Sequence, residues 1–251
     1  MERFIAYFDY LGFKQFIENN KLTYQKKIID NILRDIERAL GQTKIKFTGH
    51  GGVIADLSNS RINCINFSDT VVFWTNDNSE ESLLEIISVT YQFNLEDITF
   101  FFPARGALVY GEIESIEFKQ RNEGGGLYNI NSVFGRGLVK AHEKAEKQHW
   151  AGTIIDQSII DIMNIRGFNQ EILLKPFAKK YKVPFKVKNR TEFQEEFVMC
   201  LTKGNIDEEA FNNLSKNIRD NFAKHNKSVN SDDVKEKIEN TITFLSSFRE
   251  I

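Results

Sequence analysis

The 251-residue sequence has little proline and cysteine, three and two residues respectively, and its formal net charge is only −2. Because Cys64 and Cys200 lie far apart in apolar runs, we expect buried free thiols of a cytosolic protein rather than a disulfide framework. The balanced charge argues against a basic surface that covers nucleic acid or a membrane. We expect neither a signal peptide nor a membrane span, because no basic flank precedes an apolar N-terminal stretch and no uncharged apolar segment of membrane-spanning length occurs. We therefore expect a cytoplasmic protein without nucleic-acid or membrane partners.

What the sequence has in quantity is phenylalanine, with 22 residues. So many aromatic side chains beside so few prolines predict an ordered, aromatic-rich core rather than disorder. A chain of this length can bury one substantial core. We therefore predict one domain over residues 1–170, and C-terminal strands and helices over residues 171–251 that complete or extend it.

Hydrophobic periodicity predicts the order of the elements. Strands are expected over residues 3–9, 62–67, 70–75, 104–113 and 114–122. A further strand is expected after the glycines at 124–126 and ends at residue 134, and others are expected over 153–155, 183–188 and 195–201. Helices are expected over residues 13–40, with Asn19-Asn20 as the weakest point, and over 79–93, 135–145, 157–163, 211–222 and 234–245. The order β-α-β-β-α-β predicts an α+β fold, with a ferredoxin-like antiparallel sheet covered on one face by helices and a C-terminal helical extension.

Two acids stand at the ends of strand-like runs. Asp9 ends the first run, and Asp69 lies between the runs 62–67 and 70–75. On a ferredoxin-like sheet these two positions are neighbours, so both carboxylates could bind the same pair of divalent metal ions and hold a nucleoside triphosphate. Either residue alone is more simply explained as a helix cap or a turn residue. The pair in this order favours the metal site.

The four residues after Asp9 form a strand-to-helix turn. The backbone amides of Tyr10, Leu11, Gly12 and Phe13 would stand at a helix N-terminus, where β- and γ-phosphates are favourably bound. Gly12 would let a ligand approach the backbone without a side chain in the way. We therefore predict that residues 10–13 bind the polyphosphate.

Four short motifs occur in a recognisable order. They are Asp9-x-x-Gly12-Phe13, Ser68-Asp69, Ala104-Arg105-Gly106-Ala107-x-x-x-Gly111-Glu112 and Phe134-Gly135-x-x-Leu138. Over about residues 1–160 the sequence resembles the catalytic domains of class III nucleotidyl cyclases, in which similar motifs follow one another in this order. More narrowly, Arg105-Gly106-Ala107 and Ala141-x-x-x-Ala145-Glu146 are similar to the pyrimidine (uridylate or cytidylate) cyclases of bacterial Pycsar antiphage systems.

The resemblance implies an antiparallel homodimer with active sites at the interface. Asp9, Asp69 and the Tyr10 carbonyl would bind two Mg²⁺ or Mn²⁺ ions per site. The ribose 3′ hydroxyl would then attack the α-phosphate of a nucleoside triphosphate, releasing a cyclic nucleotide and pyrophosphate. Positioning and electrostatics carry most of such a rate enhancement, so no side-chain nucleophile is required.

The departures from the family pattern bear on the base and on the transition state. Ile65 and Ser132 stand at the two base-reading positions, and neither suits a purine edge. We therefore expect a pyrimidine substrate, UTP rather than CTP, and cyclic UMP or cyclic CMP as an antiphage signal that a separate effector senses.

The family's transition-state Asn and Arg are also replaced here, by Val139 and Glu143. Arg105, Arg136 or Lys140 could supply the missing positive charge, and the sequence does not choose among them.

Two alternatives remain. A catalytically silent, cyclase-like domain would bind a nucleotide without converting it. A relative of palm-type polymerases or diguanylate cyclases would share the two aspartates, but the chain lacks a GGDEF-like loop and further acids beside Asp69.

Overall fold

The computed structural model describes residues 1–49, 51–100, 102–188 and 190–250, with only the backbone of residues 99 and 100. The strands are β1 (Glu2–Tyr10), β2 (Ile45–Phe47), β3 (Val53–Ala55), β4 (Ile62–Phe67), β5 (Thr70–Thr75), β6 (Ala104–Glu112), β7 (Glu114–Arg121), β8 (Leu127–Phe134), β9 (Gly152–Ile155), β10 (Ala178–Val187) and β11 (Arg190–Met199). The helices are α1 (Phe13–Asn19), α2 (Leu22–Gly41), α3 (Glu80–Phe100), α4 (Arg136–Glu146), α5 (Gln157–Arg166), α6 (Gln170–Leu173), α7 (Glu208–Ala223) and α8 (Asp232–Ser246).

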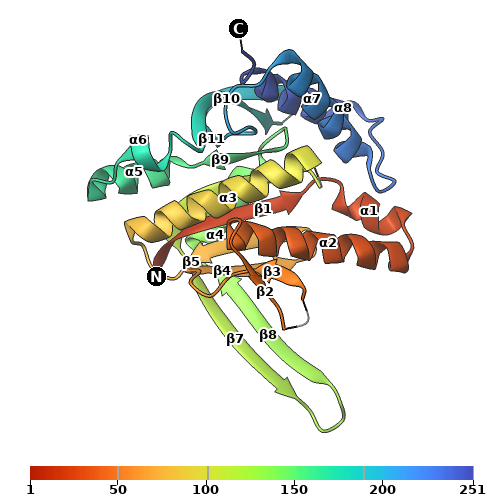
Figure 1. Ribbon diagram of the computed structural model, residues 1–251, viewed down its shortest axis with the longest axis vertical. Coiled ribbons are helices and arrows are strands. Elements are labelled where there is room, and N and C mark those ends of the chain that lie inside the picture. Colours follow the sequence, from red (N-terminus) through yellow and green to blue (C-terminus); the bar gives the residue numbers. More distant parts are fainter. Residues whose placement is uncertain (50, 101, 189, 251) are drawn as a thin grey trace.

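One seven-stranded sheet runs through the molecule in the order β10-β11-β9-β6-β1-β5-β4. Neighbouring strands are antiparallel, except that β6 and β9 run parallel. The predicted α+β fold with an antiparallel, ferredoxin-like sheet is therefore confirmed. The C-terminal strands β10 and β11 belong to this same sheet, and α7 and α8 lie at its β10 end (Figure 1). None of the helices in the described ranges combines the length and the hydropathy that a membrane span requires.

Helices cover both faces of the sheet, whereas we expected them on one face only. Side chains alternate between the two faces along β1. Phe8 and Tyr10 belong to the core cluster that contains side chains of α2 and α3. Ile5 and Tyr7 point the other way and pack with Ala141 of α4. The one-sided expectation is wrong because β1 is buried on both faces, so that α4 has an apolar surface of its own to cover.

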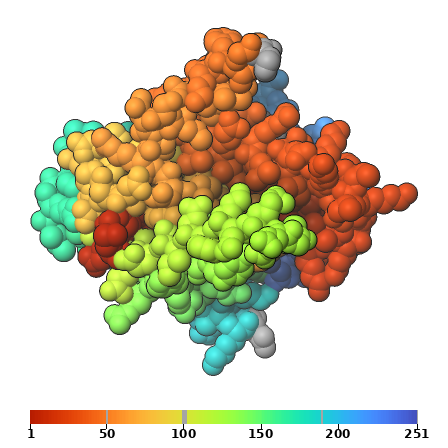
Figure 2. Space-filling model, turned by 90° about the horizontal axis from the view of Figure 1, so that it is seen from below, coloured from red at the N-terminus to blue at the C-terminus, as the bar shows by residue number. Residues whose placement is uncertain are grey.

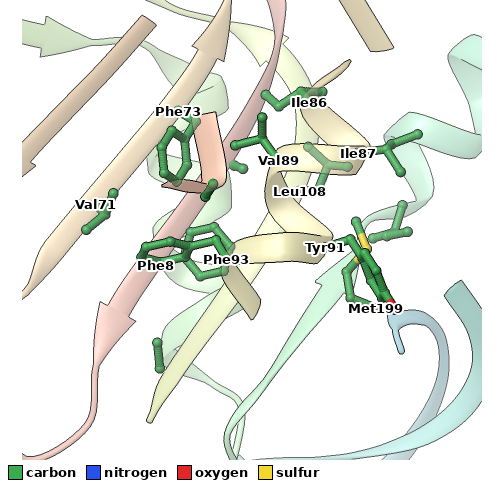
Figure 3. Close-up of a cluster of buried hydrophobic side chains, with 14 of the residues drawn as sticks. Phe8, Val71, Phe73, Ile86, Ile87, Val89, Tyr91, Phe93, Leu108 and Met199 are labelled. Atoms are coloured by element: carbon green, nitrogen blue, oxygen red, sulfur yellow. The ribbon is translucent and has the colours of Figure 1, made fainter. Parts of the chain in front are cut away.

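The phenylalanines build the larger core between the sheet and α3. Phe8 of β1 meets Phe93 of α3 edge-on at a centroid distance of 4.6 Å, and Phe73 of β5 lies 5.4 Å from Phe93 (Figure 3). Edge-to-face aromatic pairs at such distances are favourable beyond the area that they bury. This packing fixes the central strand β1, and thereby the position of Asp9 at its end.

The helix predicted over residues 13–40 is divided at the position that looked weakest. Asn20 adopts an extended backbone (φ −130°, ψ 148°), and its side-chain amide donates to the Phe16 carbonyl at 2.8 Å, which ends α1 after seven residues. Asparagine commonly satisfies a helix end in this way. The break separates α1 from α2, so that only a short helix follows the turn after Asp9.

Candidate active site

The fold brings Asp9 and Asp69 together at one end of the sheet. Asp9 pairs across strands with Thr70, the residue after Asp69, and the Tyr10 amide donates to the Asp69 carbonyl oxygen at 2.9 Å. Asp69 itself lies in the two-residue turn between β4 and β5, where Ser68 has a positive φ of 56°. Burial is the main cause that raises the pKa of Asp9, Arg105 opposes it, and the charge of Asp69 raises the pKa further. The two acids therefore share one electrostatic environment.

Arg105 is the immediate partner of Asp9. It stands directly opposite Asp9 on β6, and its Nε and Nη2 atoms both lie 2.8 Å from Asp9 Oδ2. A third nitrogen of the guanidinium donates to the Glu146 carbonyl at 2.6 Å. The Arg105 and Asp9 side chains are only 17% and 20% exposed, so this is a well-shielded ion pair. Arg105 thus delivers positive charge to the predicted metal and phosphate site.

The donor set fits Mg²⁺ or Mn²⁺ in one respect and is incomplete in another. Carboxylate oxygens are the ligands that these hard cations prefer, and the half-buried Asp69 carboxylate forms no hydrogen bond or ion pair with a described residue. Within the described ranges, no group of three or more acid, histidine or cysteine side chains is placed to hold a metal ion. Mg²⁺ usually takes one or two protein carboxylates and completes its shell with water and substrate phosphates. Asp9 and Asp69 would therefore leave most of the coordination shell of such an ion to water and substrate phosphates.

The turn at residues 10–13 is less open than we predicted. The amides of Tyr10 and Leu11 are already bonded, to the carbonyls of Asp69 and Pro103. Only the amides of Gly12 and Phe13 have no acceptor among the described residues. The seven-residue α1 also gives the turn a shorter helix than expected. The predicted polyphosphate cradle is thus reduced to the amides of Gly12 and Phe13, since Tyr10 and Leu11 have no amide left to offer.

The space beside Gly12 is filled rather than free. Gly12 has a φ of +80°, and an added Cβ would lie 2.9 Å from Cδ of Lys227 in the α7–α8 connection. The Lys227 side-chain nitrogen lies 3.8 Å from the Phe102 ring centroid and has no hydrogen-bond partner among the described residues. Glycine at this position therefore accommodates a lysine stem, which we did not predict from the sequence.

The two predicted base-reading residues lie on different sheets. Ile65 is half-buried on β4 and packs in the cluster beneath α4. Ser132 is exposed on β8, whose one partner strand within the described ranges is β7. These two strands form a long arm that projects from the body of the molecule (Figure 1). The structure therefore does not place Ser132 beside Asp9, because the two residues belong to different sheets.

The other two predicted cationic residues also lie away from Asp9. Arg136 forms an ion pair with Glu112 at 3.5 Å. Glu112 lies seven residues along β6 from Arg105, which corresponds to roughly 23 Å at about 3.3 Å per residue. Lys140 forms an ion pair with Asp156 at 2.6 Å. Of the three predicted cations, the structure places only Arg105 at the two aspartates of the same protomer.

Sequence reasoning missed a pair of residues beside Asp9. They are Tyr7 and His142 of α4, whose side chain is 51% exposed and whose Nδ1 lies 3.0 Å from the Tyr7 hydroxyl. Its charge also influences the pKa of Asp9. The one signal available in the sequence was that Tyr7 and Asp9, two residues apart on a strand, share a face.

Comparisons with known proteins support the fold. No family model matches the sequence, and no curated protein matches it significantly. The structure is similar to the catalytic core of a rhodopsin-guanylyl cyclase with converted specificity in complex with ATPαS, with a TM-score of 0.51, 10% identity, and coverage of 79% of this chain and 95% of that one. It is also similar to the guanylate cyclase domain of RhGC from Catenaria anguillulae in complex with GTP, with a TM-score of 0.52, 10% identity, and coverage of 79% and 96%. The chain has the fold of class III cyclase catalytic domains.

Proposed function

We propose that this protein cyclises a pyrimidine nucleoside triphosphate, UTP in preference to CTP, to a 3′,5′-cyclic nucleotide and pyrophosphate. The observation that carries the proposal is the meeting of Asp9 and Asp69 at one end of the sheet, in a fold shared with nucleotide-bound guanylyl cyclase domains. The 3′ oxygen of the ribose would attack the α-phosphorus, and the bond to the pyrophosphate would break.

Asp9, Asp69 and the Tyr10 carbonyl would hold two Mg²⁺ or Mn²⁺ ions. When bound, such ions supply Lewis-acid chemistry at the α-phosphate and lower the pKa of the 3′ hydroxyl. Arg105 would add positive charge for the phosphates from its place on Asp9. The amides of Gly12 and Phe13 would orient the polyphosphate tail.

The preference for a pyrimidine depends on Ile65 and Ser132. A branched apolar side chain and a short hydroxyl leave no long charged or amide group to read a purine edge. The resemblance of Arg105-Gly106-Ala107 to the antiphage cyclases motivates the further proposal that the product is a defence signal for a separate effector. Identification of the product tests the preference for a pyrimidine directly.

A homodimer would complete the site. Arg136 and Lys140 lie away from Asp9 in the same protomer, so they could act there only from a second copy. The arm offers a surface for such a copy. Ile116, Phe118 and Tyr128 are all exposed on one of its faces, with Phe118 and Tyr128 5.5 Å apart, and the arm stands in front of the rest of the chain in Figure 2. An isolated two-stranded arm is marginally stable in water, so an exposed apolar face favours a partner.

Phe118→Ser is expected to weaken this dimer. Loss of a central aromatic contact typically costs about 2 kcal/mol, or about a 30-fold increase in the dimer dissociation constant. Sedimentation velocity over a concentration series would measure the change. Lys119→Ser, on the opposite face of the same strand, is the matched control and should leave the dissociation constant unchanged. Equal effects of both substitutions, or a wild type that stays monomeric throughout, would contradict the proposed arm contact.

A product assay tests the proposed function. Purified protein is incubated with each of the four ribonucleoside triphosphates and Mn²⁺, and the products are identified by mass spectrometry. We expect cyclic UMP from UTP and less cyclic CMP from CTP. A purine cyclic nucleotide as the main product would contradict the pyrimidine proposal, and no cyclic product at all would contradict the cyclase proposal.

The alternative of a silent nucleotide-binding domain has one observation in its favour. Val139 and Glu143 occupy the positions where the family resemblance expects the transition-state groups. A silent domain would be stabilised against heat by UTP with Mn²⁺, and the nucleotide would be recovered unchanged. Thermal shift and nucleotide recovery from one sample therefore separate the two functions.

A further inference from the structure

A chain of hydrogen bonds links α4 to the hairpin that carries Asp69. His142 Nδ1 lies 3.0 Å from the Tyr7 hydroxyl, which in turn lies 3.3 Å from Thr70 Oγ1. The His142 and Tyr7 rings also meet nearly edge-on, at 5.3 Å and 71°. Thr70 follows Asp69 and pairs with Asp9 across the strands. The imidazole of His142 is therefore held on the same face of the sheet as Asp9 and Thr70, next to the turn that carries Asp69.

The donor and acceptor roles in these two hydrogen bonds set the tautomer of His142. The Tyr7 hydroxyl carries a single proton, so it can donate to only one of its two partners, His142 and Thr70. If the Tyr7 hydroxyl donates to Thr70, it accepts from His142 Nδ1–H, and the lone pair of Nε2 is then free. The hydrogen bond at one imidazole nitrogen commonly fixes the role of the other in this way.

The His142 side chain is half exposed, so Nε2 is accessible to solvent. Its nearest acid is Glu146, at 3.6 Å, which is too far for a hydrogen bond. The other charged groups around the site are Asp9, Asp69 and Arg105. After burial, the largest influences on the pKa of Asp9 come from Arg105 and Asp69, followed by His142. Arginine cannot release its proton in proteins, and we assign Asp69 to the metal ions.

We propose that His142 is the catalytic residue that accepts the proton of the ribose 3′ hydroxyl, and that Tyr7 positions it. The inference rests on the proposed function. The 3′ oxygen forms its bond to the α-phosphorus, the bond between the α-phosphorus and the pyrophosphate oxygen breaks, and the 3′ proton passes to Nε2 and from there to solvent. Histidine is the side chain that performs such proton transfers most often.

His142→Gln tests the role of the imidazole. Because glutamine cannot take up the proton, we expect kcat to fall by about 10²–10³-fold, within the usual range for a general base. Isothermal titration calorimetry with 3′-deoxy-UTP and Mn²⁺ should give wild-type binding, since this analogue has no 3′ proton to lose. The pH profile of kcat should lose its acidic limb in the variant.

Two further variants distinguish proton transfer from a structural effect. In His142→Gly, added imidazole should restore part of kcat in proportion to its concentration. Tyr7→Phe keeps the ring but removes the acceptor of Nδ1–H, and should lower kcat by about tenfold with His142 intact, because the tautomer is no longer fixed. Lys147→Gln, an exposed position at the end of α4, is the control and should retain wild-type kcat.

The outcomes separate this inference from the proposed function. If wild-type protein makes a cyclic nucleotide and His142→Gln keeps its kcat and pH profile, the role of His142 is wrong while the cyclase remains. Loss of analogue binding together with kcat, without rescue by imidazole, would show that His142 acts only in structure and would also overturn the proposal. A wild type without cyclic product would remove the proposed function, and this inference with it.

Discussion

Asp69→Asn is expected to abolish nearly all cyclase activity while leaving the protein as stable as the wild type. The Asp69 side chain has no partner among the described residues, so the amide breaks no contact of the fold. What it removes is an anionic ligand for the metal ions. Transition-state stabilisation by such ions is worth several kcal/mol, so we expect kcat with UTP and Mn²⁺ to fall by about 10³-fold.

The comparison with Asp9 sharpens this test. Asp9→Asn should lose as much activity, but it also leaves the shielded Arg105 guanidinium without its counter-charge, so its melting temperature should fall. Asp56→Asn, a surface substitution in the loop after β3, serves as control and should keep full activity. Cyclic product is measured by mass spectrometry and stability by differential scanning calorimetry. An Asp69→Asn protein with more than a tenth of wild-type kcat would contradict the metal site.

Lys227→Met is expected to remove a large pH dependence of stability. Lys227 is only 7% exposed, and burial, reinforced by the nearby Lys224, lowers its pKa from 10.5 to about 7. Between these two pH values the unfolded chain binds a proton that the folded protein does not. Stability of the wild type should therefore rise as pH increases from about 7 to about 10.5, and this contribution should be lost as pH falls through the same window.

Urea unfolding of both proteins across this window would measure the effect. Methionine keeps most of the stem that packs against Gly12 but has no proton to bind, so the difference in unfolding free energy between the two proteins should be largest at pH 7 and should shrink toward pH 10.5. Lys216→Met, an exposed position on α7, should follow the wild-type curve. A constant difference between wild type and Lys227→Met at all pH values would mean that Lys227 is not buried as an unpaired amine.

The sequence predicted the strands best where apolar residues alternate or run together between clear turns. The bounds of β4 and β5 match the prediction, because Ser68-Asp69 is a short polar interruption between two such runs. The prediction was poorer for β10 and β11, which begin five residues earlier than expected. There, charged side chains occupy the strands, as in the pair of Lys180 with Glu195, and the apolar pattern starts late.

Some residues of the candidate site could likewise be predicted from the sequence, and others could not. Asp9, Asp69 and Arg105 could be predicted because each stands at a strand end or in a motif, and an antiparallel sheet brings those positions together. Lys227 could not, because its contact with Gly12 depends on how the distant α7–α8 connection folds back on α1. The face covered by α4 was also beyond prediction, since a strand buried on both sides shows no alternation.

The short strand β9 has a practical consequence for handling this protein. It has only four residues and pairs on one side with β6 and on the other with β11. A chain cut off after residue 170 would keep β9 but leave its outer row of amides and carbonyls bare, and bare strand edges recruit other molecules into aggregates. Shortened versions intended for crystallisation or fusion to a reporter should therefore retain the C-terminal third of the chain.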